Sequence, residues 1–101
     1  MKNKKWFLAI ALIGLFCFSV QAELQIVTTT EDIAALAREV AGEWAKVDFI
    51  AKGYQDPHFV DAKPSYLLKL KKADLFIEVG LELEVAWAGQ LLTNARNSKI
   101  L

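Results

Sequence analysis

The chain has little of the chemistry that most metal and redox sites require. Its 101 residues contain one cysteine, Cys17, and one histidine, His58. An internal disulfide needs two cysteines, and a zinc site takes about four nitrogen, sulfur or oxygen ligands. The sequence therefore excludes an internal disulfide within these residues and offers a single imidazole toward any zinc site.

The chain also lacks a charge surplus and the common catalytic motifs. Lysine and arginine number 12 and aspartate and glutamate number 12, so no basic excess is present to attract nucleic acid. The five glycines are too scattered to form a loop that cradles phosphate, and neither GxSxG nor HExxH occurs. Nucleic-acid binding, nucleotide binding and the best-known hydrolase mechanisms are therefore not expected.

Residues 1–22 have the layout of a bacterial export signal. Three lysines crowd the first five positions, and the uncharged run Trp6–Phe18 follows. The run is shorter than the roughly 20 residues that cross a bilayer, and the small residues Val20 and Ala22 suit cleavage after Ala22. We expect a cleavable signal peptide; the alternative is a membrane anchor that is retained.

Cys17 falls inside this apolar run. Lipoprotein processing favours a small residue directly before the cysteine, whereas here Phe16 precedes it. Removal of residues 1–22 leaves 79 residues, which carry no cysteine and a net charge of about −3. The expected product is an exported chain whose fold does not depend on a disulfide.

From Glu23 onward, strand-like and helix-like segments alternate. Apolar runs rich in β-branched and aromatic residues predict strands over residues 24–28, 47–51 and 75–79. Three- and four-residue apolar spacing predicts helices over residues 31–44, 64–73 and 83–97. Such alternation is typical of an α/β fold with a parallel sheet of βα repeats, expected over residues 23–101 as one partial lobe.

Several local features allow sharper predictions. The apolar stripe on the first helix predicts that its residues face the core, and Thr29 with Asp32 forms a plausible N-terminal cap. The large aromatic residues on stripes and strands are expected in the core: Phe49, Phe76, Trp87 and, at the end of the first stripe, Trp44. Three lysines near the end of the second helix are expected to be solvated: Lys69, Lys71 and Lys72.

His58 lies in the long segment after the second predicted strand. Ligands of open parallel sheets bind beyond the carboxyl ends of the strands, so this loop is placed at the ligand-binding edge. From the residues alone, His58 is either a structural histidine bonded to backbone, a metal ligand or an acid–base group. Asp56, Asp61 and Glu82 could add oxygen ligands, although the two aspartates more commonly cap or turn such a loop.

The order and spacing of several short motifs resemble the zinc/manganese ABC-transporter solute-binding proteins, in their amino-terminal lobe. The motifs are Gly53-Tyr54-Gln55-Asp56-Pro57-His58, Lys63-Pro64-Ser65, Lys72-Ala73-Asp74-Leu75 and Gly80-Leu81-Glu82-Leu83-Glu84 with Trp87. The resemblance covers nearly all of residues 23–101, but only the front part of a typical member's first lobe.

The resemblance implies a two-lobed receptor that captures zinc or manganese in the periplasm and delivers it to an ABC permease at the inner membrane. His58 looks like the family's first metal-binding histidine, and the other ligands would lie beyond Leu101. It implies neither catalytic residues nor a resident cofactor, and we expect a monomer. One alternative is a truncated remnant of such a receptor without metal-binding activity, because the sequence ends where a fourth strand is expected to start, at residue 98. Another is an exported enzyme with His58 as general base.

Overall fold

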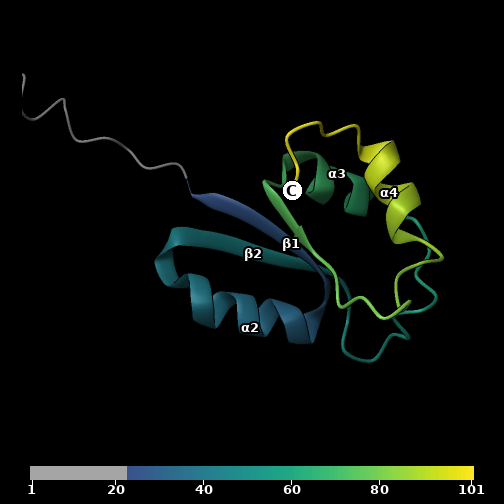
Figure 1. The fold of residues 1–101 in the computed structure, drawn as a ribbon, viewed down its shortest axis with the longest axis horizontal. Coiled ribbons are helices and arrows are strands. Elements are labelled where there is room, and N and C mark those ends of the chain that lie inside the picture. The colour runs from purple at the N-terminus through teal and green to yellow at the C-terminus, as the bar shows by residue number, and fades with distance from the viewer. Residues whose placement is uncertain (1–22) are drawn as a thin grey trace, which may run out of the picture.

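The computed structural model describes residues 23–101, so the predicted signal peptide and Cys17 lie outside the described part of the chain. Three strands form one parallel sheet: β1 Leu24–Thr30, β2 Ala45–Ala51 and β3 Leu75–Ile77. Their order is β2-β1-β3, with β1 in the centre (Figure 1). The predicted α/β fold with a parallel sheet of βα repeats is confirmed.

Helices cover both faces of this sheet. Helix α2, Glu31–Ala41, continues into a short 3-10 turn, Gly42–Trp44, and lies on one face (Figure 1). Helices α3, Pro64–Lys72, and α4, Ala88–Ala95, lie together on the other face. Because successive side chains of a strand point to opposite faces, β1 contributes to two separate cores, Ile26 to the core under α2 and Val27 to the core under α3 and α4.

Helices α2 and α3 start where the sequence predicts, but the cap of α2 needs a correction. Helix α3 begins at Pro64 as expected, because proline has no N–H to leave unsatisfied in the first turn. Helix α2, however, is capped by Thr30 and not by Thr29: the Thr30 hydroxyl oxygen accepts from the Ile33 N–H at 3.5 Å. Thr29 is fully buried and has a different partner, described below.

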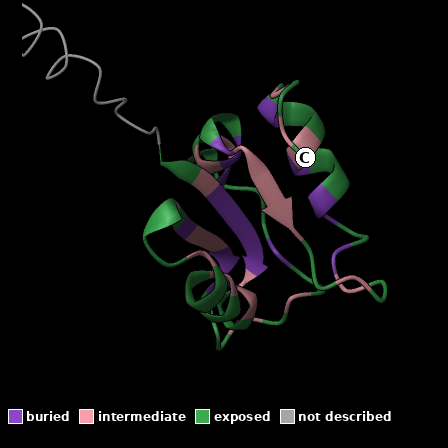
Figure 2. Cartoon of the chain, turned by 60° about the vertical axis from the view of Figure 1, so that its left-hand side comes forward, coloured by how far each residue is buried: buried purple, intermediate pink, exposed green. Residues whose placement is uncertain are grey.

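The prediction that the apolar stripe of α2 faces the core is wrong for three of its large residues, although Ala37 of the same stripe packs against the core. Leu36, Val40 and Trp44 are 63%, 90% and 71% exposed, and Ala34 is the one fully buried residue of α2. The helix packs on the sheet through the side that carries Ala34, and its outer surface is exposed over most of its length (Figure 2). Of the other predicted core aromatics, Trp87 is buried and both Phe49 and Phe76 are partly buried.

The last helix is shorter than predicted, as is β3. Helix α4 begins at Ala88, and residues 81–87 form turns instead of the first helical turns expected from position 83. Left-handed backbone precedes these turns, with φ of 83° at Gly80, 55° at Leu81 and 69° at Glu82. A right-handed helix cannot include these three residues, so the chain after β3 is not helical up to Glu82.

The free edge of β3 has a further backbone partner. The Leu101 N–H donates to the Asp74 carbonyl at 3.2 Å, and the Phe76 N–H donates to the Leu101 carbonyl at 2.8 Å. This pair of bonds is the pattern of a parallel ladder, which places Leu101 beside β3 on the side away from β1. None of the helices in residues 23–101 has the length and apolar character needed to cross a membrane.

Candidate metal centre

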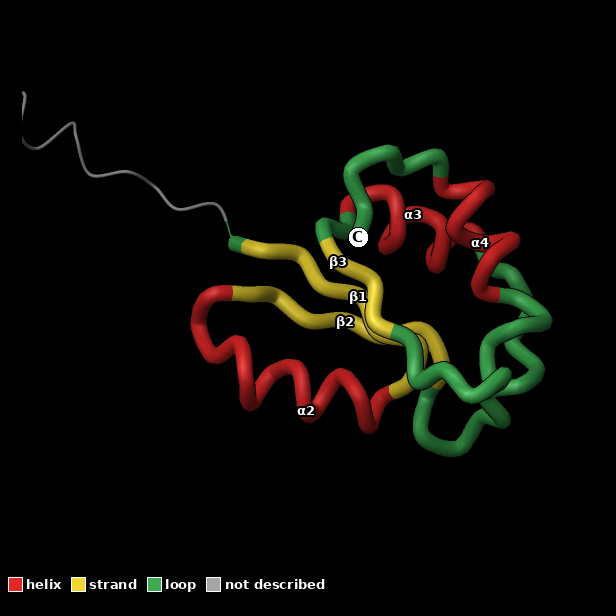
Figure 3. The backbone as a smooth tube through the Cα atoms, viewed as in Figure 1, coloured by secondary structure: helices red, strands yellow, loops and turns green. Residues whose placement is uncertain are grey.

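The loops that carry the predicted site residues gather at one edge of the sheet. Because the strands are parallel, the segments after β1, β2 and β3 all leave from the same edge. Figure 3 shows the long loop after β2 and the loop after β3 together at that end of the molecule. A hydrogen bond of 2.7 Å joins them, from the Trp87 indole N–H to the Pro57 carbonyl.

His58 is held by Asp56 through two hydrogen bonds. The backbone N–H of His58 donates to Asp56 Oδ1 at 2.9 Å, and the ring Nδ1 lies 2.7 Å from the same oxygen. The first bond closes a short turn across Pro57, which is the loop-turning role predicted for Asp56. The second fixes the direction of the imidazole ring.

This contact determines which ring nitrogen is available for a metal. The backbone N–H of His58, and then its ring, hold the pKa of Asp56 below its ordinary value of 3.8, so the carboxylate is ionised at neutral pH. An ionised carboxylate only accepts hydrogen bonds, so Nδ1 must carry the proton that points toward it. In the neutral imidazole the lone pair is therefore on Nε2, the arrangement that a carboxylate-oriented metal ligand adopts.

The other predicted oxygen donors do not join His58 in this structure. Asp61 and Glu82 are exposed, and no hydrogen bond within residues 23–101 links either of them to His58. Over the same residues, no three histidine, cysteine, aspartate or glutamate side chains form a group that could hold a metal ion. Within residues 23–101 the candidate site therefore consists of the His58 imidazole, oriented by Asp56, and the His58 side chain is 55% exposed.

Glu84 also lies near the edge of the sheet where the loops gather, and the sequence did not identify it as a residue of interest. Its side chain is 3% exposed, yet its carboxylate accepts from the Thr29 hydroxyl at 2.7 Å and from the N–H groups of Val79 at 2.7 Å and Gly80 at 3.1 Å. It therefore ties the end of β1 to the loop after β3. One signal was present: Glu84 shares the helical spacing of Ala88, Leu91 and Ala95, all buried, so an acid on that stripe indicates a buried carboxylate.

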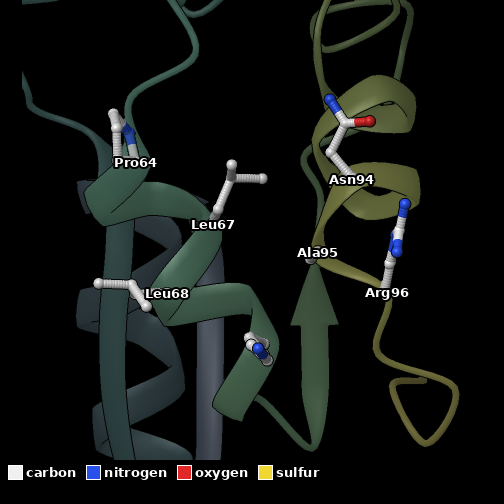
Figure 4. A pocket seen from close by; sticks show the side chains of 7 residues that line it. Pro64, Leu67, Leu68, Asn94, Ala95 and Arg96 are labelled. Carbon is white, nitrogen blue, oxygen red and sulfur yellow. The ribbon is translucent and has the colours of Figure 1, made fainter.

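The surface has one hollow beside the loop after β3 and another between helices α3 and α4. One, of about 350 Å³, is lined by acidic and small residues that include Glu78, Glu82 and Glu84. The other, also about 350 Å³, is an apolar groove between α3 and α4, where Leu67 of α3 lies across from Asn94 and Arg96 (Figure 4). His58 lines neither hollow, so the imidazole faces solvent on the loop surface.

Lys69 departs from the prediction that the lysines near the end of α3 are all solvated. Its ammonium donates to Asp48 Oδ1 at 3.1 Å and to the Phe49 carbonyl at 3.0 Å, in the middle of β2. Lys71 and Lys72 are exposed as predicted. None of the three lysines contacts His58 or Asp56 through a hydrogen bond in the described residues, so they are not part of the candidate site.

Comparison with known proteins gives consistent matches. The family described as "ZnuA: Zinc-uptake complex component A periplasmic" matches residues 26–101. The manganese ABC transporter substrate-binding lipoprotein scaA of Streptococcus gordonii is 31% identical over 103 residues, which cover 91% of this chain and 33% of that protein. PsaA of Streptococcus pneumoniae, a manganese lipoprotein of the same kind, is 33% identical over 76 residues. The chain thus spans about a third or less of the length of these relatives.

Solved structures agree on the fold. The Mn-bound periplasmic metal binding protein from candidatus liberibacter asiaticus superposes with a TM-score of 0.70 at 19% identity, over 79% of this chain and 29% of that one. Zn(II)-bound AdcA from Streptococcus pneumoniae gives a TM-score of 0.63 at 26% identity, over 78% of this chain and 17% of that one.

Proposed function

Since the chain belongs to the ZnuA family of periplasmic zinc-uptake components, we propose that residues 23–101 supply one face of a receptor for a transition metal, with His58 as a metal ligand. The observation that carries the proposal is the Asp56–His58 pair, which leaves Nε2 of an oriented imidazole pointing away from the carboxylate. Remaining ligands would come from outside residues 23–101, because a single imidazole binds a divalent ion weakly.

Zinc or manganese is the proposed cargo. Imidazole suits several transition metals, and the relatives include manganese transporter lipoproteins and a zinc-bound structure. Selectivity between the two ions depends on ligand number and hardness, so the ligands that complete the site would decide it. We propose either ion as the bound substrate and an ABC permease of the inner membrane as the partner to which a monomeric receptor delivers it.

Metal binding is proposed in preference to acid–base catalysis. A carboxylate that orients an imidazole also occurs in general-base dyads, and Asp56 gives His58 that geometry. A dyad of this kind acts on a nucleophile within hydrogen-bond reach, and in the described residues the ring of His58 is bonded to Asp56 alone. The family is one of transport components, which favours the metal-ligand role.

Export is part of the same proposal. We propose that residues 1–22 direct the chain across the inner membrane and are removed after Ala22, so that the metal site works in the periplasm. The relatives named above are lipoproteins, whereas the only cysteine here, Cys17, follows Phe16. Mass spectrometry of the exported product tests this directly: a chain that starts at Glu23 supports cleavage, and a lipid-modified cysteine contradicts it.

The test of the binding proposal is a pair of titrations with Zn²⁺ and Mn²⁺ against a competing chelator, made on a full-length version of the receptor that includes the ligands beyond residues 23–101. The unchanged protein is compared with His58→Ala and with Asp61→Ala, an exposed change in the same loop. We expect His58→Ala to lose at least about tenfold in metal affinity with an unchanged circular dichroism spectrum, and Asp61→Ala to bind normally. Equal affinity of His58→Ala and the unchanged protein would contradict the ligand role. Absence of binding by the unchanged protein would favour a remnant that keeps the fold without the activity.

A further inference from the structure

The peptide group between Pro57 and His58 is held at both of its polar atoms. Its carbonyl oxygen, on Pro57, accepts from the Trp87 indole N–H at 2.7 Å. Its N–H, on His58, donates to Asp56 Oδ1 at 2.9 Å. Because a peptide group is planar and rigid, fixing both atoms fixes the plane and with it the position of the Cα from which the His58 side chain extends.

The two anchors of this plane differ in kind. Asp56 belongs to the same exposed loop as His58, with a side chain that is 57% exposed, so it moves with the loop. Trp87 is 6% exposed and belongs to the core under α3 and α4, so it moves with the body of the protein. The bond from Trp87 joins the peptide before His58 directly to this core, and Val60, two residues further on, is buried in the same core cluster.

Trp87 is itself held by Glu84. The Glu84 carbonyl accepts from the backbone N–H of Trp87 at 3.1 Å and from that of Ala88 at 3.0 Å, which sets the first turn before α4. The Glu84 carboxylate is in turn bonded to Thr29 at the end of β1 and to Gly80 after β3. A continuous series of hydrogen bonds therefore runs from the ends of β1 and β3, through Glu84 and Trp87, to the peptide that precedes the imidazole.

A buried indole N–H needs an acceptor. The acceptor used here is the carbonyl directly before the only histidine of the chain. The loop from Lys52 to Lys63 is otherwise mostly exposed, with Tyr54 and Phe59 at 83% and 79% exposure. An exposed loop holds an imidazole to within the fraction of an ångström that a metal site needs only where rigid elements support it.

We propose that Trp87 is a positioning residue for His58: its indole N–H holds the Pro57–His58 peptide in the plane that directs the imidazole toward the metal. This inference deepens the proposed function and rests on it for the identity of the ligand. The positioning itself concerns the metal-free protein and is measurable without any metal.

The experiment compares Trp87→Phe with the unchanged protein and with Leu91→Ala. Phenylalanine keeps a buried aromatic ring but has no N–H, and replacement of Trp87 by 3-benzothienylalanine removes the N–H with almost no change of shape. Leu91 is 1% exposed in the same core cluster, so Leu91→Ala loosens α4 without removing the bond to Pro57. Each protein is examined metal-free by amide hydrogen exchange at His58 and by the ¹⁵N signals of its imidazole, and then titrated with Zn²⁺.

We expect the Trp87 variants to show faster amide exchange at His58, shifted imidazole signals and a Zn²⁺ affinity about tenfold lower, as follows removal of an outer partner of a ligand. Leu91→Ala should lower the melting temperature but leave the amide exchange at His58, the imidazole signals and the Zn²⁺ affinity unchanged. Unchanged exchange and imidazole signals in the Trp87 variants would overturn the positioning role, as would equal changes in Leu91→Ala. If the unchanged protein bound no Zn²⁺, the proposed function would fail, while the metal-free measurements would still decide the role of Trp87.

Discussion

The carboxylate of Glu84 accepts a hydrogen bond of 2.7 Å from the hydroxyl of Thr29, 55 residues earlier in the chain. Both side chains are buried, and two backbone N–H groups of the loop after β3 complete the coordination of the carboxylate. A buried carboxylate without such donors would be strongly unfavourable, so the three donors account for its presence in the core.

Glu84→Gln should therefore destabilise the fold. The amide that replaces one carboxylate oxygen presents N–H donors where Thr29, Val79 and Gly80 already supply donors, so at least one donor loses its acceptor. We expect the free energy of unfolding to fall by about 1–3 kcal/mol, measured by urea denaturation. Glu82→Gln, an exposed change two residues away, should be close to neutral. Equal effects of the two variants would contradict the structural role of Glu84.

Asp56→Asn tests the orientation of the imidazole. An asparagine can still accept from the His58 N–H, but it is a weaker acceptor for the ring and leaves the tautomer less firmly set. Metal affinity should fall by about 10–100-fold, by the same chelator competition, while the melting temperature changes little. Asp61→Asn is the matched control in the same loop. A loss of affinity of the same size in both variants would show that loop charge matters and that ring orientation does not.

Asp74 predicts a pH dependence of stability. Its carboxylate accepts from the Gln25 N–H at 2.8 Å and from Lys99 at 3.1 Å, and these bonds lower the pKa of Asp74 from its ordinary value of 3.8. A carboxyl with a lowered folded-state pKa stabilises the fold above about pH 3.8, and this stabilisation is lost as the pH falls through the folded-state pKa. Asp74→Asn should therefore melt at a lower temperature than the unchanged protein at pH 7.

The same comparison at low pH provides the check. At a pH below the folded-state pKa of Asp74 both proteins carry a neutral side chain at this position, so their melting temperatures should converge. Asp61→Asn should follow the unchanged protein at both values. A difference between Asp74→Asn and the unchanged protein that stays constant across this range would mean that the charge of Asp74 contributes nothing.

Leu81→Gly should stabilise the protein. Leu81 has a φ of 55° and is 94% exposed, so its side chain gains little from packing and carries the strain of left-handed backbone. Glycine adopts this conformation without strain but has more freedom in the unfolded chain, so the net gain should be about 0.5–1 kcal/mol by urea denaturation. Leu68→Gly, at an exposed position inside α3, should instead destabilise by about 1 kcal/mol. Destabilisation by Leu81→Gly would contradict the strain argument.

The sequence predicted the sheet because strand signals depend on local composition. The β-branched and aromatic runs around Val27 and Ile50 fall on strands that are buried from both faces, as in parallel sheets. Residues at strand ends were less certain: β1 extends to Thr30, so the cap of α2 moves from Thr29 to Thr30. A single position at this boundary changes which threonine is free to meet Glu84.

The errors have a common physical origin. Apolar spacing reports which residues share a face of a helix, but it does not report whether anything packs against that face, and so Trp44 and Val40 were placed in the core. Likewise, the four-residue spacing from Leu83 to Trp87 predicts a helix, but residues 81–87 form turns and α4 begins only at Ala88. Tertiary contacts decide both cases, and spacing along the chain does not contain them.

From the sequence, His58 could be proposed as a ligand, but the contacts that hold it could not be predicted. A histidine in the loop after a parallel strand lies at the ligand-binding edge by topology alone, which is how His58 was selected. The supports come from distant segments: Trp87 approaches Pro57 across 30 residues of sequence. No local sequence pattern predicts such a contact, so the hydrogen bond from Trp87 to Pro57 could be found only in the three-dimensional structure.

The central place of β1 also sets an order of events in folding. Leu24 pairs with Ala45, close along the chain, whereas Ile26 must wait for Leu75 to pair on the other side. Closing the longer loop costs more chain entropy, so we expect the β1–α2–β2 unit to assemble first and β3 to add to it afterward. Mutations in β2 should then slow refolding, while mutations in β3 should mainly speed unfolding. Until β3 pairs, one edge of β1 has unpaired backbone N–H and C=O groups. The pairing of β3 also brings the segment that carries Trp87 toward the histidine loop, so we expect the loop to become rigid only at that step.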